Sequence, residues 1–214
     1  MLSLYDHAAS CNCYKVRLLL AQLGLPYERI PVDIFAGETL TPEFGAINPA
    51  RSTPVLTADG RHLAESGAIL GFLAEGTELA GRDRLERAEI LRWLLYEQAD
   101  IVPAIGGLRF RLLTGRLEPS DPDALRRRAS AVEVLALLDG HLAGRDFLVA
   151  DRYTIADIAV YGYVHRSAEA GVDLAPHAAL GDWLERVSTR DGYFEDVEPY
   201  GANARPGRGR SIYD

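Results

Sequence analysis

The chain has 214 residues, of which 25% are charged and 48% apolar, and this average globular composition excludes a mostly disordered or collagen-like chain. Its length suits one large domain or two small ones. The 23 lysines and arginines against 31 aspartates and glutamates give a net charge of −8, which disfavours binding to nucleic acid or to an anionic membrane surface.

The N-terminal segment changes from a strand pattern to a helix pattern. Residues 2–5 form a short β-type run. Gly24 follows a stretch with the apolar spacing of an amphipathic helix and is expected to end that helix. The apolar residues at this spacing are Val16, Leu19, Leu20 and Leu23.

Three further strands and a helix are predicted before residue 76. Residues 27–34 have the β-branched and aromatic content of a strand, and residues 53–56 form another after a loop rich in Gly and Pro. Asp59-Gly60 is typical of a hairpin turn, so residues 61–63 are expected to return as the fourth strand. A helix follows over residues 65–75. This order indicates a small mixed α/β sheet with helices.

Beyond residues 76–83 the pattern is helical. Long helices are predicted over residues 84–114 and 122–143, and Pro103 and the Gly106-Gly107 pair are expected to kink or break the first. The change of pattern predicts two domains, one of residues 1–78 and one of residues 84–214.

The last part of the chain begins with a helix start at Thr154. Thr154 followed by Asp157 fits a capping box, and Tyr153 is placed to pack on Ile158 across it. A final helix is predicted over residues 176–190. The Gly/Arg/Pro-rich residues 201–210 are expected to be irregular.

Cysteine usage and the N-terminal sequence favour the cytoplasm. Cys11 and Cys13 are two residues apart, and neither has a distant partner with which to close a loop. No second Cys/His pair at a ligand spacing accompanies them, so no metal site is expected. No run approaches the roughly 20 apolar residues of a membrane span, and no export signal is visible.

Polar residues mark the starts of two predicted helices. Ser10 precedes the first, where unpaired N–H groups stabilise a thiolate or another anion, although a serine there also serves as a plain cap. Glu65 and Ser66 begin the next helix. They too could be capping groups, or together they could hold a ligand with both an ammonium and a carboxylate group.

The Thr53-Pro54 bond is a candidate for a cis peptide bond in a tight turn, although most such bonds are trans. A cis bond would leave the backbone N–H and C=O of Thr53 free to pair with an extended, peptide-like ligand.

Four segments in order resemble the cytosolic glutathione S-transferases, with a serine-type site similar to theta-like and zeta-like bacterial members. They are SCNCYKVRLLL at residues 10–20, NPARSTPVL at 48–56, ESGAI at 65–69 and TIAD at 154–157. The resemblance covers nearly the whole chain. It implies a thioredoxin-like N-terminal domain that binds glutathione, an all-α C-terminal domain that forms the acceptor pocket, and a homodimer.

The resemblance also implies roles for single residues. Ser10 would donate a hydrogen bond to the glutathione sulfur and lower the thiol pKa from about 8.5, so that the thiolate attacks a small hydrophobic electrophile in detoxification. Thr53, before Pro54, would pair with the cysteinyl part of glutathione, and Glu65 with Ser66 would hold the γ-glutamyl end. Glutathione is then a co-substrate, and no cofactor is implied.

One departure lies in the turn before Thr53. Arg51-Ser52 replaces the Gly-Gln of the common pattern, so the usual glutamine contact is absent. Arg51 is expected to attract the glycyl carboxylate of glutathione instead, with Ser52 beside it.

Three alternatives stay open at this point. Cys11, next to Ser10, could form a mixed disulfide with glutathione, as in thiol-transferring members, which would make the protein a reductase or peroxidase. The protein could also be an isomerase like the zeta class, although this chain has Tyr14 and Asn12 at the positions of that class's usual tryptophan and cysteine. The fold could also serve as a non-catalytic binding or regulatory module.

Overall fold

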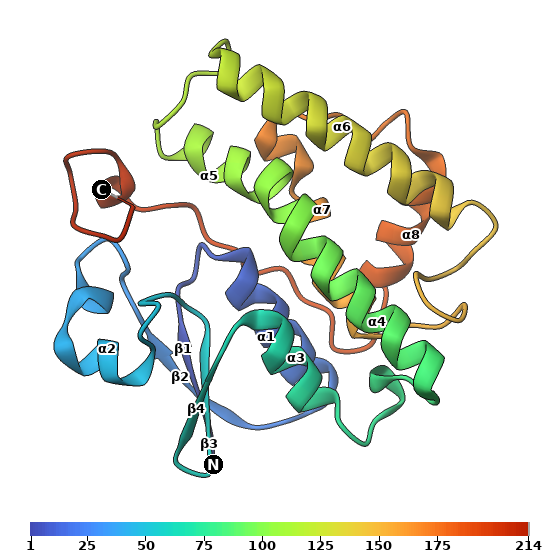
Figure 1. Cartoon of the computed structure of the whole chain (residues 1–214), viewed down its shortest axis with the longest axis horizontal. Helices are drawn as coiled ribbons and strands as arrows, with labels where there is room; N and C mark the ends of the chain where they lie inside the picture. Colours follow the sequence, from blue (N-terminus) through green and yellow to red (C-terminus); the bar gives the residue numbers. More distant parts are fainter. Residues whose placement is uncertain (214) are drawn as a thin grey trace. The chain divides into compact units, whose positions relative to one another are not determined.

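The computed structural model describes residues 1–213, which form two compact units (Figure 1). The first unit contains Met1–Leu73 and the chain from Phe194 onwards, and the second is Ala74–Tyr193. The sequence interpretation placed residues from 194 onwards in the second domain, whereas in the structure they belong to the first unit. Asp214, at the end of the predicted second domain, lies outside the described residues.

The first unit is built on a four-stranded sheet in the order β2-β1-β3-β4. Strand β1 (Leu2–Asp6) pairs in parallel with β2 (Tyr27–Pro31) and antiparallel with β3 (Val55–Ala58). Strand β4 (Arg61–Ala64) returns along β3 through a two-residue turn. Asp59 and Gly60 have φ angles of 50° and 74°, as a tight hairpin turn requires. The mixed α/β sheet predicted from the sequence is confirmed.

Three α-helices belong to this unit. Helix α1 (Cys11–Gln22) makes the crossover that the parallel pair β1 and β2 needs, and α3 (Ser66–Ala74) follows β4. Helix α2 (Pro42–Ile47) lies in the segment rich in Gly and Pro that was expected to be a loop. Its six residues are too few to show an apolar period, and it is fixed by its cap, in which the Thr41 hydroxyl accepts the N–H of Phe44 at 3.1 Å.

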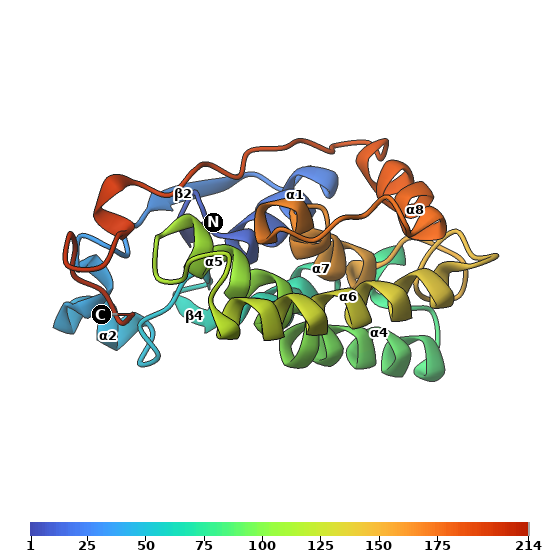
Figure 2. The same ribbon diagram turned by 90° about the horizontal axis from the view of Figure 1, so that it is seen from above.

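The second unit is helical (Figure 2). Where a kink or break was expected, the chain stays helical from residue 84 to residue 113, with a π-helical segment, η3, that contains Pro103. The wider turn accommodates a proline that has no N–H to donate. The helices of this unit are α4 (Arg84–Tyr96), η3 (Glu97–Gly106), α5 (Gly107–Leu113), α6 (Pro122–Leu142), α7 (Ile155–Val164) and α8 (Ala178–Ser188).

Short 3₁₀ helices join these elements. They are η1 (Glu38–Leu40), η2 (Glu78–Ala80), η4 (Ser167–Ala170) and η5 (Ala202–Ala204). In the part of the chain that the structure describes, no helix is both long and apolar enough to cross a membrane.

The predicted capping box of α7 is present. The Thr154 hydroxyl accepts the N–H of Ala156 at 3.2 Å, and the Asp157 carboxylate accepts the N–H of Thr154 at 2.9 Å. The same carboxylate also accepts the Leu148 N–H at 3.0 Å and the Trp183 indole N–H at 2.9 Å. The box therefore ties α7 to α8 and to the preceding loop as well as starting its own helix.

Candidate functional site

Ser10 lies where β1 passes into α1. Its backbone is extended, with φ −85° and ψ 120°, and its hydroxyl oxygen accepts the N–H of Cys13 at 3.3 Å. The Ser10 N–H donates to the carbonyl of His7 at 2.9 Å, which fixes the loop before the helix. A serine hydroxyl that accepts one hydrogen bond still has its hydrogen to donate. Ser10 can therefore cap the helix and donate to a bound anion at the same time.

The start of α3 meets the start of α1. Ser66, only 3% exposed, donates its hydroxyl hydrogen to the side-chain oxygen of Asn12 at 3.3 Å. Asn12 was not among the predicted site residues, although a short polar residue in the first turn of α1 is a signal that could have identified it. Two helix N-termini thus lie side by side, and each presents unpaired N–H groups and partial positive charge.

Glu65 comes directly before α3. It is exposed and has a φ angle of 69°, a left-handed conformation that is costly for a residue with a side chain. Backbone outliers of this kind concentrate at binding sites, and the Glu65 carboxylate supplies the negative charge that an ammonium group needs.

The turn before β3 reaches the same region. The Thr53-Pro54 peptide bond, a candidate for the cis form in the sequence, is cis. The Thr53 side chain lies within interaction range of the Cys13 thiol in the first turn of α1. Behind it, the buried Asn48 side chain donates to the Ser52 carbonyl at 2.9 Å and holds the turn in place. Ser10, Thr53 and Ser66 are therefore brought together through contacts with one turn of α1.

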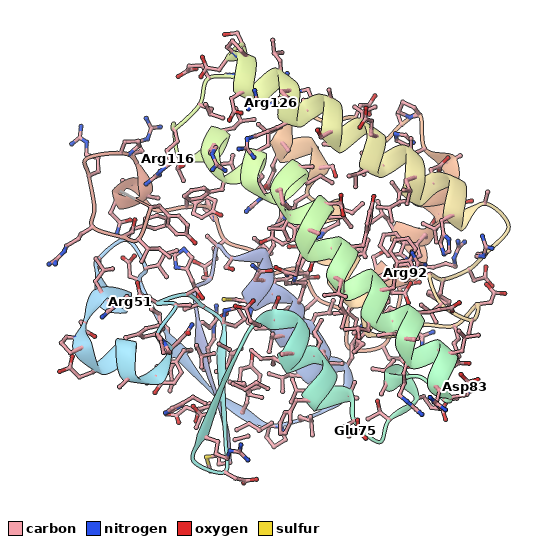
Figure 3. All side chains as sticks on the ribbon, in the orientation of Figure 1. Arg51, Glu75, Asp83, Arg92, Arg116 and Arg126 are labelled. Atoms are coloured by element: carbon pink, nitrogen blue, oxygen red, sulfur yellow. The ribbon has the colours of Figure 1, made fainter. Side chains whose placement is uncertain are left out.

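Arg51 bonds the backbone of the segment before α2. Its guanidinium donates to the carbonyls of Thr39 and Thr41, at 2.9 and 2.8 Å, beside the start of α2 (Figure 3). These bonds give Arg51 a role in holding α2 against the turn. Its expected attraction for a carboxylate stays a prediction, since the same guanidinium has further N–H groups.

The two cysteines are buried. Cys11 is 1% exposed and Cys13 is not exposed, and they form no disulfide. Burial, and next the nearby Asp6 carboxylate, raise the pKa of Cys13 to about 11. A thiol of this kind is protonated at neutral pH and is a poor nucleophile.

Among residues 1–213, no group of three or more His, Cys, Asp or Glu side chains is placed to hold a metal ion. The groups that the site offers are hydroxyl and backbone N–H donors at the starts of α1 and α3, together with the Glu65 carboxylate. Such a set can bind a zwitterionic ligand and stabilise a thiolate.

Comparisons with known proteins agree with this geometry. Residues 9–75 match the model of the glutathione S-transferase N-terminal domain, and residues 99–188 match that of the C-terminal domain. The disulfide-bond oxidoreductase YfcG of Escherichia coli is 32% identical over 89% of this chain and 91% of its own length.

Two solved structures are similar as well. A possible glutathione S-transferase from Rhodopseudomonas palustris has a TM-score of 0.83 and 41% identity, over 92% of this chain and 98% of the other. A glutathione transferase from Pseudomonas putida, with one glutathione disulfide bound per subunit, has a TM-score of 0.79 and 28% identity, over 89% and 88% of the two chains.

Proposed function

The chain belongs to the glutathione S-transferase family of enzymes, and we propose that it transfers the thiolate of glutathione to small, hydrophobic electrophiles. The observation that carries the proposal is the Ser10 hydroxyl, which caps α1 and keeps a hydrogen to donate. Clearance of reactive compounds in the cytoplasm would be the cellular purpose of this reaction.

Ser10 would act on the sulfur of bound glutathione. Its hydroxyl donates to the thiolate, and the positive end of α1 adds favourable electrostatics, so the thiol pKa falls below about 8.5. The ionised sulfur then attacks the electrophile. The thiol proton leaves to solvent, and the leaving group departs with the electron pair of the bond that breaks.

The rest of the tripeptide would lie across the turn before β3 and the start of α3. The backbone of Thr53, next to Pro54, pairs with the cysteinyl part, while Glu65 and Ser66 hold the ammonium and carboxylate of the γ-glutamyl end. Arg51 and Ser52 lie in the same turn and would complete the site on the glycyl side.

Replacement of Ser10 tests the proposal. Ser10→Ala should lower kcat with a model aryl halide by about 100-fold, because one donor to a developing anion is lost. The pKa of the bound thiol, followed by thiolate absorbance, should rise, while Kd for glutathione changes little. Ser10→Thr keeps a hydroxyl and a cap and serves as the control. Equal activity in the alanine and threonine variants would contradict the role given to Ser10.

A second candidate function is glutathione-dependent reduction of disulfides. The named activity of the YfcG relative and the glutathione disulfide bound to the P. putida protein favour it. The bound glutathione thiolate attacks one sulfur of the disulfide, forms a mixed disulfide and releases the other sulfur as a thiolate. This route uses the same Ser10 donor. It does not require Cys11, whose burial weighs against attack by that residue.

Cys11 can be tested directly. Cys11→Ala should retain full disulfide reductase activity, because the attacking sulfur belongs to glutathione. If Cys11 is the nucleophile instead, the wild-type protein should gain the mass of one glutathione and the variant should not.

A further inference from the structure

The C-terminal strap, which we define as residues 194–213, packs along the first unit (Figures 1 and 2). Its beginning is anchored on α1. The Tyr14 hydroxyl donates to the Phe194 carbonyl at 2.9 Å, and the Arg17 guanidinium bonds both carboxylate oxygens of Asp196, at 2.6 and 2.9 Å. Arg17 is 1% exposed and also pairs with the buried Asp6. This ion-pair network fixes where the strap meets the first unit.

The middle of the strap covers the loop of residues 7–9, which connects β1 to Ser10. The Glu198 N–H donates to the Ala8 carbonyl at 3.2 Å. The ring of Tyr200 stacks on that of His7, with centroids 6.3 Å apart and 29° between the planes, and meets Phe35 edge-on at 6.1 Å.

The far end of the strap is held by the segment after β2. The Asn203 amide donates to the Asp33 carboxylate at 2.8 Å, and the Arg210 N–H donates to the Phe35 carbonyl at 2.8 Å. Ala204 is fully buried. Tyr200 is therefore held between two anchored stretches, and the far one keeps the bond from Arg210 to Phe35 when the Asn203 bond is removed.

His7 links the strap to Ser10. Its carbonyl accepts the Ser10 N–H at 2.9 Å, and its own N–H donates to the Cys13 sulfur at 3.4 Å. Its ring bonds the Val32 carbonyl at 3.0 Å, meets the Phe35 ring edge-on at 5.6 Å and stacks on Tyr200. The His7 backbone therefore bonds Ser10, while the His7 ring contacts Tyr200 of the strap.

We propose that Tyr200 is a positioning residue, which holds His7 and thereby fixes the direction in which the Ser10 hydroxyl meets the sulfur of bound glutathione. The inference rests on the proposed function. Hydrogen bonds weaken steeply when their geometry is poor. If the loop of residues 7–9 can move by a fraction of an ångström, the hydrogen bond from Ser10 to the glutathione sulfur becomes weaker. Tyr200 can therefore affect this bond without touching glutathione.

Three variants test the positioning role. Tyr200→Ala removes the ring, and Tyr200→Phe keeps it. Asn203→Ala loosens the same strap at Asp33, away from the loop of residues 7–9, and is the matched control. Tyr200→Ala should lower kcat/KM about tenfold and raise the pKa of the bound glutathione thiol by about 1, while Tyr200→Phe and Asn203→Ala stay close to wild type. The half-buried Tyr200 can be truncated without loss of the fold, which thermal unfolding checks.

Two further measurements assign the effect to Ser10. In a Ser10→Ala background, Tyr200→Ala should raise the thiol pKa no further, because the donor it positions is already gone. In the ligand-free protein, hydrogen exchange followed by mass spectrometry should be about tenfold faster in residues 7–14 of Tyr200→Ala, and unchanged in Asn203→Ala.

The outcomes separate the two proposals. A thiol pKa that depends on Ser10 and not on Tyr200 overturns the positioning role and leaves the proposed function standing. Failure of the wild-type protein to bind glutathione overturns the proposed function, and the exchange of residues 7–14 then decides alone whether Tyr200 orders the Ser10 loop. Unchanged exchange in Tyr200→Ala contradicts the inference in either case.

Discussion

At the scale of single residues, burial separates the two cysteines from the reactive centre. Because the pKa of Cys13 is raised to about 11, on the order of one thiol in 3,000 is ionised at pH 7.5, and the thiolate becomes dominant only above pH 11. Cys11 is 1% exposed. We therefore expect iodoacetamide to label neither cysteine in the native protein at pH 7.5, while both react after unfolding in urea. Mass spectrometry of the peptide that contains Cys11 and Cys13 measures the labelling. Rapid labelling of Cys11 in the native protein would instead indicate that Cys11 is the nucleophile.

Several site residues could be predicted from the sequence because their local chemistry is distinctive. A serine before a helix start predicted the cap at Ser10, and a proline at a strand start made the bond before Pro54 a candidate for the cis form. The position of Asn12 in the first turn of α1 was a usable signal, but its contact with Ser66, 54 positions away, leaves no local pattern in the sequence. The same reason hid the bonds of Arg51 to the backbone before α2.

At the scale of elements, the π-helical segment η3 brings Gly106 against α7. A Cβ atom at Gly106 would lie 2.5 Å from the ring of Tyr163, whereas one at Gly140 in α6 would have no atom within 4 Å. Gly106→Ala should therefore lower the free energy of unfolding by about 1–3 kcal/mol through overpacking. Gly140→Ala should raise it by about 0.4–1 kcal/mol through the entropy of the unfolded chain. Urea unfolding of the two variants measures both changes in the free energy of unfolding. An unchanged value for Gly106→Ala would show that Tyr163 in α7 moves aside at little cost.

A helix with an apolar period was predicted close to its observed bounds, as α6 illustrates, and a clear cap predicted the start of α7. The π-helical turn was not predicted, because Pro103 and two glycines satisfy the sequence rules for a break. What keeps this stretch helical is packing against α6 and α7, which lie far from it along the chain.

For the whole molecule, the sequence indicated where strands are followed by helices, but not that residues from 194 onwards belong to the first unit. The strap lacks periodicity, and its Gly and Pro content is typical of an irregular tail. Its place on the first unit depends on pairs such as Arg17 with Asp196, 179 residues apart, and His7 with Tyr200. A domain boundary placed from composition alone therefore assigns the strap to the helical unit that precedes it in the sequence.

We expect the protein to form a homodimer. Helix α4 exposes Leu91 and Leu95, 54% and 61% accessible and one turn apart, and an apolar pair of this kind suits an interface with a second copy. Sedimentation should give twice the 23.4 kDa of one chain. Leu95→Asp should weaken the dimer by about 100-fold or more, because an unpaired carboxylate would be buried, whereas Ile212→Asp, at an exposed strap residue, should leave it intact. A wild-type monomer at micromolar concentration would contradict the expectation, and an intact Leu95→Asp dimer would place the interface on another face.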